Sequence, residues 1–190
     1  RLRHQLCERN FALRQAHFPD SRENLALALR RISFEGMLLY QAAAAALRGE
    51  RKAGVVIPAG EPDCRAYWQS LPFPPTGAQQ RVLAEIAADL SAPQAMGRLV
   101  QGDVGCGKTA LAFGAMFLAA RAGYQSALMA PTEILARQHL ESARKTLEPL
   151  GIRCGLLLGG MKAKERREAL EQIASGGWQA VIGTHALISE

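Results

Sequence analysis

The sequence of 190 residues is poor in aromatic residues and cysteine, and it contains no long apolar run. Phe, Trp and Tyr make up 6% of the chain, and its 4 cysteines form no Cys-x-x-Cys pair. Scattered cysteines argue against a zinc site and against a disulfide framework, and they fit a reducing cytosol. The longest apolar stretches, such as residues 41–47, are too short to span a bilayer. We therefore expect a cytoplasmic protein without a membrane partner.

The composition supports a folded core and permits an anionic partner. Hydrophobic residues make up 48% of the chain, and the mean hydropathy is -0.04, which suits one or two globular domains. The formal net charge is +6 at pH 7, so binding to a polyanion is permitted but not required. The basic run at residues 162–167 leaves the same alternatives open, because such runs are also typical of solvated helix faces.

Three regions of different composition divide the chain. Residues 1–60 are helical and rich in alanine, residues 61–75 form a connector rich in proline, and residues 76–190 alternate helical and strand patterns. The connector predicts a boundary between a helical linker region and a separate α/β domain.

The helical region is expected to contain two helices separated by a break at residues 18–21. Asp20 with Glu23 three positions later predicts a capping arrangement for the second helix, and Gly36 predicts a break within it. This second helix carries apolar residues at roughly helical spacing, which predicts a face packed on another element: Leu25, Leu29, Ile32, Leu38 and Leu39.

The remainder of the chain has the pattern of a parallel sheet. Short apolar segments are typical of buried strands at residues 98–101, 125–130, 154–158 and 180–184. Helical patterns flank and separate them at residues 78–90, 110–118, 132–147 and 161–175. Strands separated by helices predict an α/β fold, with a parallel sheet covered by helices on both faces.

The most specific motif lies between the first of these strands and the helix after it. It matches the phosphate-binding loop pattern G-x-x-x-x-G-K-[ST] at every fixed position: Gly102-Asp103-Val104-Gly105-Cys106-Gly107-Lys108-Thr109. Glycines let the backbone curl so that successive N–H groups point at anionic oxygens. Lys108 supplies a charge for the β- and γ-phosphates, and the Thr109 hydroxyl can ligate Mg²⁺. With a helix dipole behind the loop, the motif predicts nucleotide binding.

Further motifs accompany this loop, in the following order along the chain: Leu71-Pro72-Phe73, Thr76-Gly77-Ala78-Gln79, Arg98 to Gln101, Met129 to Ala136, Gln138-His139 and Gly183 to Leu187. Together they resemble the motor lobe of superfamily 2 helicases, and most closely that of the RecG family of bacterial branched-DNA helicases. His17-Phe18-Pro19 and Arg30 to Glu35 resemble the segment that links this family's wedge domain to its motor. The resemblance therefore covers nearly the whole chain.

This resemblance implies a P-loop NTPase (RecA-like) fold, with an incomplete motor lobe preceded by a helical linker. It also implies a parent protein that uses ATP and Mg²⁺ to translocate on double-stranded DNA. Such a protein remodels stalled forks and Holliday junctions by branch migration, and we expect it to act as a monomer. The serine that is usual in the loop of this family is replaced by Cys106, a change that leaves the backbone cradle intact.

Three further site residues follow from the resemblance, and each has a structural alternative. Gln79 matches the glutamine that reads the adenine edge, but Thr76 with Gln79 is also a helix capping box. Thr132 matches a residue that holds DNA phosphates, but it is equally suited to cap a helix. His185 matches a DNA-facing motif, whereas a lone histidine at a strand end is more often structural.

Other classes of protein share parts of this pattern. The translocase of transcription-coupled repair has the same residues at Gly102 to Gly105, although residues 131–133 fit the RecG family better. A kinase or GTPase domain also has a phosphate loop, but the Asn-Lys-x-Asp motif that reads guanine does not occur in these 190 residues. A DNA-binding module without enzymatic activity is the third alternative.

The Asp-Glu-x-His motif that supplies the catalytic carboxylates of the family does not occur in these 190 residues either. We therefore expect a fragment of a helicase that hydrolyses ATP negligibly by itself, even with DNA present. Phosphoryl transfer needs charge stabilisation and a positioned water, and a phosphate loop supplies only part of both. A turnover assay on the isolated chain measures this, and robust hydrolysis would refute the prediction.

Overall fold

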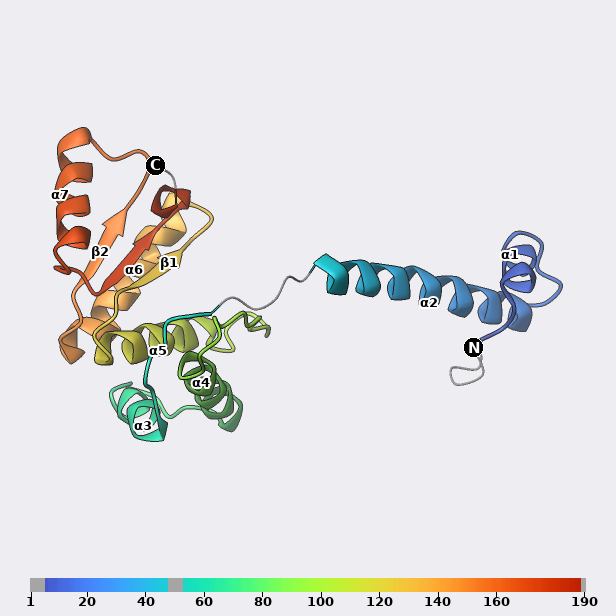
Figure 1. Ribbon diagram of the computed structural model, residues 1–190, viewed down its shortest axis with the longest axis horizontal. Helices are drawn as coiled ribbons and strands as arrows, with labels where there is room; N and C mark the ends of the chain where they lie inside the picture. The colour runs from blue at the N-terminus through green and yellow to red at the C-terminus, as the bar shows by residue number, and fades with distance from the viewer. Residues whose placement is uncertain (1–5, 48–52, 189–190) are drawn as a thin grey trace. The chain divides into compact units, whose positions relative to one another are not determined.

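A computed structural model describes residues 6–47 and 53–188, and the chain divides into two compact units between residues 51 and 52 (Figure 1). The sequence pattern had placed the end of the helical region later, at residue 60. In the ranges described, no helix is long and apolar enough to cross a membrane.

Most of the expected helices and strands are present. In chain order the elements are α1 (Arg9–His17), α2 (Arg22–Leu47), α3 (Glu61–Gln69), α4 (Gly77–Leu90), α5 (Lys108–Arg121), β1 (Ser126–Met129), α6 (Glu133–Leu147), the 3-10 turn η2 (Glu148–Leu150), β2 (Cys154–Leu157), α7 (Ala163–Ala174), β3 (Ala180–Gly183) and the 3-10 turn η3 (His185–Leu187). The three later strands form within one residue of the segments predicted for them. The larger differences lie in the first unit and in the region before the phosphate loop.

The first unit is a pair of helices, α1 and α2, with the expected break between them. The residue that caps α2 is Ser21 rather than Asp20, because the Ser21 Oγ accepts a hydrogen bond from the Asn24 N–H at 3.1 Å. The Asp20 N–H instead donates to the Oε1 of the buried Gln15 at 2.8 Å. Asp20 therefore closes the turn after α1, and the hydroxyl one residue later starts the next helix.

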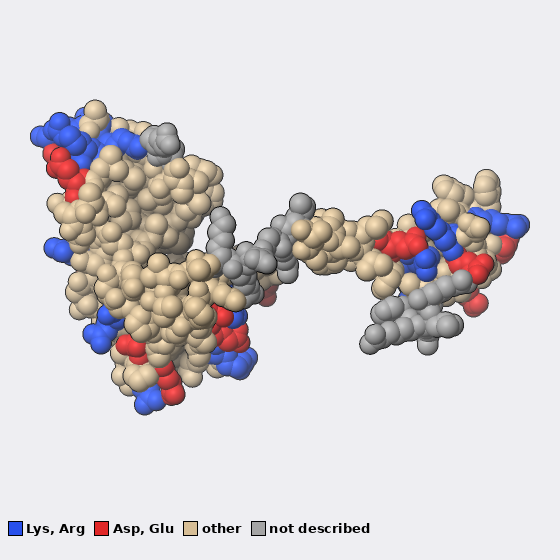
Figure 2. Space-filling view, viewed as in Figure 1, with Lys and Arg blue, Asp and Glu red and all other residues tan. Residues whose placement is uncertain are grey.

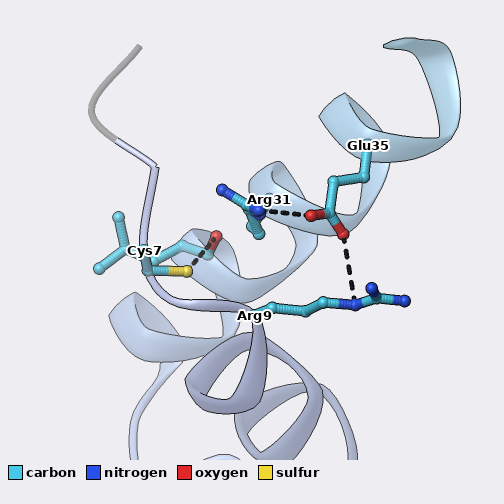
Figure 3. Close-up of polar contacts among 5 residues, drawn as sticks. Cys7, Arg9, Arg31 and Glu35 are labelled. Carbon is cyan, nitrogen blue, oxygen red and sulfur yellow. Dashed lines mark hydrogen bonds and ion pairs between the residues drawn. The ribbon is translucent and has the colours of Figure 1, made fainter. Parts of the chain in front are cut away.

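Polar contacts join α1 to α2 (Figure 3). Glu35 of α2 pairs with Arg31 one turn earlier on the same helix. It also faces Arg9 of α1, whose Nε lies 3.8 Å from the Glu35 Oε2. The Cys7 Sγ lies 3.5 Å from a backbone carbonyl of α2. Because Arg9 is largely exposed, its ion pair adds less than about 1 kcal/mol, and it orients the helices more than it stabilises them.

The apolar face predicted for α2 is mostly uncovered. Ala12 and Ala28 are fully buried, but α1 has 9 residues and α2 has 26, so α1 can cover about 14 Å of a helix about 39 Å long. Four of the five predicted face residues are between 38% and 71% exposed: Leu29, Ile32, Leu38 and Leu39. The predicted break at Gly36 is wrong, since α2 continues through it; a glycine costs a helix only about 1 kcal/mol.

The segment predicted as a connector contains α3, which belongs to the core of the second unit. Its Tyr67 is fully buried, with ring centroids 5.1 Å from Trp68 and 5.6 Å from Phe117 of α5. Its hydroxyl donates to the Ala110 carbonyl at 2.6 Å. Pro62, which favours the connector interpretation, stands in the first turn of α3, where proline is tolerated because its missing N–H has no helical partner.

The sheet is parallel, with β3 between β1 and β2. Helices α6 and α7 make the crossovers that parallel strands require. On one face, Cys154 and Ile182 pack in a core shared with α5 and α6. On the other face, Leu157 and Val181 pack against α7. The predicted α/β fold with helices on both faces of a parallel sheet is confirmed.

The strand predicted at residues 98–101 is not formed. Leu99 is 86% exposed, and β1 and β2 pair only with β3 among the strands described. A strand is defined by ladder hydrogen bonds to a neighbour, so an apolar segment without one stays irregular. Arg98 ties the segment to α4 instead, through Asp89 at 2.7 Å and through Glu85.

Candidate functional site

The phosphate loop turns through two glycines in the left-handed region. Gly105 has φ 83 and Gly107 has φ 90, values that strain any residue with a Cβ. Gly102 meets a different limit, because a Cβ there would lie 2.6 Å from the Cys106 Sγ. Helix α5 begins at Lys108 without a side-chain cap, so the N–H groups of its first turn remain available to an anion. The helix predicted behind the loop is confirmed.

Lys108 lies over this loop. Its Nζ donates to the carbonyl oxygens of Gly102 and Asp103, both at 2.7 Å. An ammonium group has three donors. The third faces the Cys106 Sγ at 3.9 Å, a long contact that a ligand can replace without breaking either carbonyl bond. Thr109, the second residue of α5, is half-buried. The geometry therefore gathers one positive charge, one hydroxyl and a set of backbone donors, which together suit a phosphate chain with an associated cation.

The first turns of α5 are held from behind by α3 and α4. The Tyr67 hydroxyl donates to the carbonyl of Ala110, in the first turn of α5. Gly114, one turn further, lets the helices approach closely, since a Cβ there would lie 2.8 Å from Leu83 of α4 and 3.0 Å from Tyr67. Burial raises the pKa of Tyr67, so its hydroxyl stays protonated and keeps donating. Loop and helix are thereby fixed to a packed support.

Gln79 is the residue of α4 that contacts the loop. The capping box predicted from the sequence is present: the Gln79 N–H donates to the Thr76 Oγ1 at 3.3 Å, and the Gln79 Oε1 accepts from the Thr76 N–H at 2.8 Å. The Gln79 Nε2 also donates to the Cys106 carbonyl at 2.9 Å. One side chain therefore caps α4 and holds the phosphate loop.

The two residues predicted to contact DNA follow neighbouring strands. Thr132 follows β1 and caps α6, its Oγ1 accepting from the Leu135 N–H at 3.3 Å. His185 follows β3 and starts η3 with an exposed side chain. The Ala130 N–H donates to the Gly183 carbonyl at 2.7 Å, which ties the two segments together. The fold thus places both motifs at the carboxyl edge of the sheet.

The basic run at residues 162–167 behaves as a solvated helix face in this structure. Lys and Arg side chains gather over α7 (Figure 2), where Lys164 lies 4.0 Å from Glu168 and Arg167 lies 3.9 Å from Glu171. Such exposed i,i+4 pairs contribute about 0.3–0.5 kcal/mol each. The positive charge is therefore partly neutralised along the helix.

Two contacts around the site lack any local sequence signal. Tyr67 reaches Ala110 from a helix that the sequence pattern did not predict. The Gly160 N–H, in the loop after β2, lies 3.4 Å from the Glu133 Oε1 at the start of α6. Both contacts join segments that are distant along the chain, so only packing brings them together.

The cysteines do not form a metal site. Cys64 and Cys154 are buried, and burial raises the pKa of both thiols, that of Cys154 to about 11. Protonated thiols are poor metal ligands. Across the described ranges, no group of three or more His, Cys, Asp or Glu side chains is arranged to hold a metal ion.

Comparison with known proteins places this architecture in a family. The model of the DEAD/DEAH box helicases matches residues 76–190, from the cap of α4 to the end of the chain. The chain belongs to the DEAD/DEAH box helicase family. The matched segment contains the phosphate loop, Thr132 and His185, and the helices and strands that position them.

Curated relatives within the helicases extend the likeness to nearly the whole chain. The ATP-dependent DNA helicase RecG of Bacillus subtilis (strain 168) is 46% identical over 94% of this chain and 27% of its own length. RecG of Streptococcus pneumoniae is 44% identical over 99% of the chain and 28% of its own length. The expected resemblance to the RecG family is confirmed, and the chain spans about a quarter of these relatives.

A solved helicase structure has the same fold. The structure of RecG bound to a three-way DNA junction matches with a TM-score of 0.80 and 34% sequence identity, over 98% of this chain and 26% of that one. The match includes the helical region before the α/β unit, so the RecA-like fold and the helical segment preceding it are both confirmed.

The cap of α6 provides a test of Thr132. Replacing Thr132 by Ala removes the oxygen that accepts from the Leu135 N–H, and we expect it to lower the free energy of unfolding by about 1 kcal/mol. Thr132→Ser keeps the oxygen and is expected to retain that stability. Urea titrations of the two variants measure the difference; an equal loss in both would contradict the capping role.

Proposed function

We propose that this chain binds the phosphates of ATP with Gly102 to Thr109. The observation that carries the proposal is the left-handed geometry at Gly105 and Gly107, followed at once by α5. This geometry leaves backbone donors unpaired beside the Lys108 ammonium. The names of the RecG relatives, which are ATP-dependent helicases, support ATP as the nucleotide.

Each residue of the loop has a role in this proposal. The backbone of Gly102 to Gly107 cradles the phosphates, and Lys108 contacts the β- and γ-phosphates as a point charge. Thr109 ligates Mg²⁺ together with phosphate oxygens, and the ion neutralises charge on the transferred group. Gln79 lies beside the loop, and the resemblance to this family implies a contact between its amide and the adenine.

For the parent protein, we propose ATP-driven translocation on branched double-stranded DNA, at stalled forks and Holliday junctions, by a monomer. Support comes from the solved relative, which is RecG bound to a three-way DNA junction. Thr132 and His185, at the same edge of the sheet, are the proposed DNA contacts of this chain. The transcription-coupled repair translocase remains the second candidate, because it shares the loop sequence.

Replacing Lys108 by Ala tests the nucleotide site. In the full-length protein we expect ATP turnover to fall at least about 100-fold with the fold intact, because a charge at the transferred phosphate is lost. Lys164→Ala, which removes an exposed ammonium paired with Glu168, is the matched control and should keep full activity. Persistent turnover in Lys108→Ala would show that the loop assignment is wrong.

Binding to forked DNA separates the candidate classes. For a DNA motor we expect the logarithm of the binding constant to fall linearly with the logarithm of salt concentration, by about 0.9 per phosphate contacted, and nucleotide to shift the affinity. Fluorescence anisotropy of a labelled fork with the full-length protein measures both. A kinase or GTPase would show no such binding, and a DNA module without ATPase activity would bind equally well with and without nucleotide.

A further inference from the structure

The side-chain amide of Gln79 contacts two backbone groups. Its oxygen accepts from the Thr76 N–H at 2.8 Å, and its nitrogen donates to the Cys106 carbonyl at 2.9 Å. The side chain also lies against the next residue of the loop, since a Cβ on Gly107 would collide with the Gln79 Nε2. Gly107 is therefore constrained twice, by its φ of 90 and by the amide beside it.

The bond to Cys106 has a consequence at Gly107 because the two residues share one peptide unit. A trans peptide is planar, so its C=O and N–H point in opposite directions, and the described backbone contains no cis bond. With the Cys106 carbonyl turned toward α4, the Gly107 N–H is turned away from α4. A phosphate loop requires this arrangement, with carbonyls outward and N–H groups toward the anion.

We propose that Gln79 is a positioning residue for the phosphate cradle: by holding the Cys106 carbonyl, it aims the Gly107 N–H at the phosphates. The inference rests on the proposed nucleotide binding and deepens it. Recognition of adenine by a glutamine amide needs one donor and one acceptor on the same side chain. Here one lone pair of the amide oxygen and one N–H of the amide nitrogen are used within the protein. The bond to Cys106 acts on the loop itself, so this contribution of Gln79 extends to ligands that carry no base.

Inorganic tripolyphosphate, which has no base, distinguishes this role from adenine reading. Gln79→Met keeps the length of the side chain and removes the amide. In the full-length protein we expect it to weaken binding of tripolyphosphate and of ATP by a similar factor, about 2- to 10-fold, the range of one net hydrogen bond. Isothermal titration calorimetry at constant Mg²⁺ measures both affinities. Weaker ATP binding with unchanged tripolyphosphate binding would overturn the proposal.

Thr76→Ala is the matched control for the helix cap. It removes the Thr76 Oγ1 that accepts from the Gln79 N–H and leaves the bond to Cys106 in place. We expect it to lower the thermal stability without changing the tripolyphosphate affinity. If Thr76→Ala weakens tripolyphosphate binding as much as Gln79→Met does, the effect comes from the cap of α4, and the positioning role is wrong.

Lys108→Ala distinguishes a failure of the proposed nucleotide site from a failure of the proposed role of Gln79. We expect it to abolish binding of both ligands, whatever Gln79 does. If Lys108→Ala binds them as tightly as the unaltered protein, or if the unaltered protein binds neither, the proposed nucleotide site fails, and the role of Gln79 fails with it. If Lys108→Ala abolishes binding of both ligands but Gln79→Met leaves the tripolyphosphate affinity unchanged, only the role of Gln79 is overturned.

Discussion

The second unit depends on one constraint: the short backbone segment that we propose to bind phosphates has to present its N–H groups to them. Such a segment cannot satisfy its own donors, so neighbours have to hold it in place. Here Gly105 and Gly107 supply the conformation, and α5 begins immediately behind them. Tyr67 and Gln79 then fix the helix and the loop from α3 and α4. The support is a packed set of helices, not a strand of the sheet.

The sheet has a separate task, which is to bring other motifs to one edge. Because β1 and β3 are parallel neighbours, the residues that follow them emerge at the same end. Thr132 and His185 are placed there by topology alone. The bond between Ala130 and Gly183 then joins the two segments. The proposed DNA contacts and the proposed phosphate site are in this way carried by one unit while being positioned by different elements.

Predictions of local structure from the sequence were reliable where one interaction within a few residues decides whether the structure forms. The capping box at Thr76 and Gln79 formed because donor and acceptor lie three residues apart. At Asp20 the same reasoning failed, because the Asp20 carboxylate accepts a hydrogen bond from the Gln15 side-chain amide and the adjacent Ser21 hydroxyl caps the helix. The prediction of a strand at residues 98–101 failed for another reason. The apolar pattern of this segment was typical of a strand, but a strand also requires a neighbouring strand to pair with.

The sequence by itself determined the phosphate-loop motif, the family to which the chain belongs, the positions of β1 to β3 and the alternation of helix and strand. Glycine geometry and hydrophobic periodicity are local properties, so the loop, the strands and the helices need no knowledge of distant contacts. The family followed from the resemblance of the motifs. Tertiary structure alone decided that α3 is core, that Gln79 reaches Cys106, and that the face of α2 stays largely uncovered by α1. Each of these depends on which segments meet in space, and contacts over 27 or 43 positions of the chain leave no periodic trace in it.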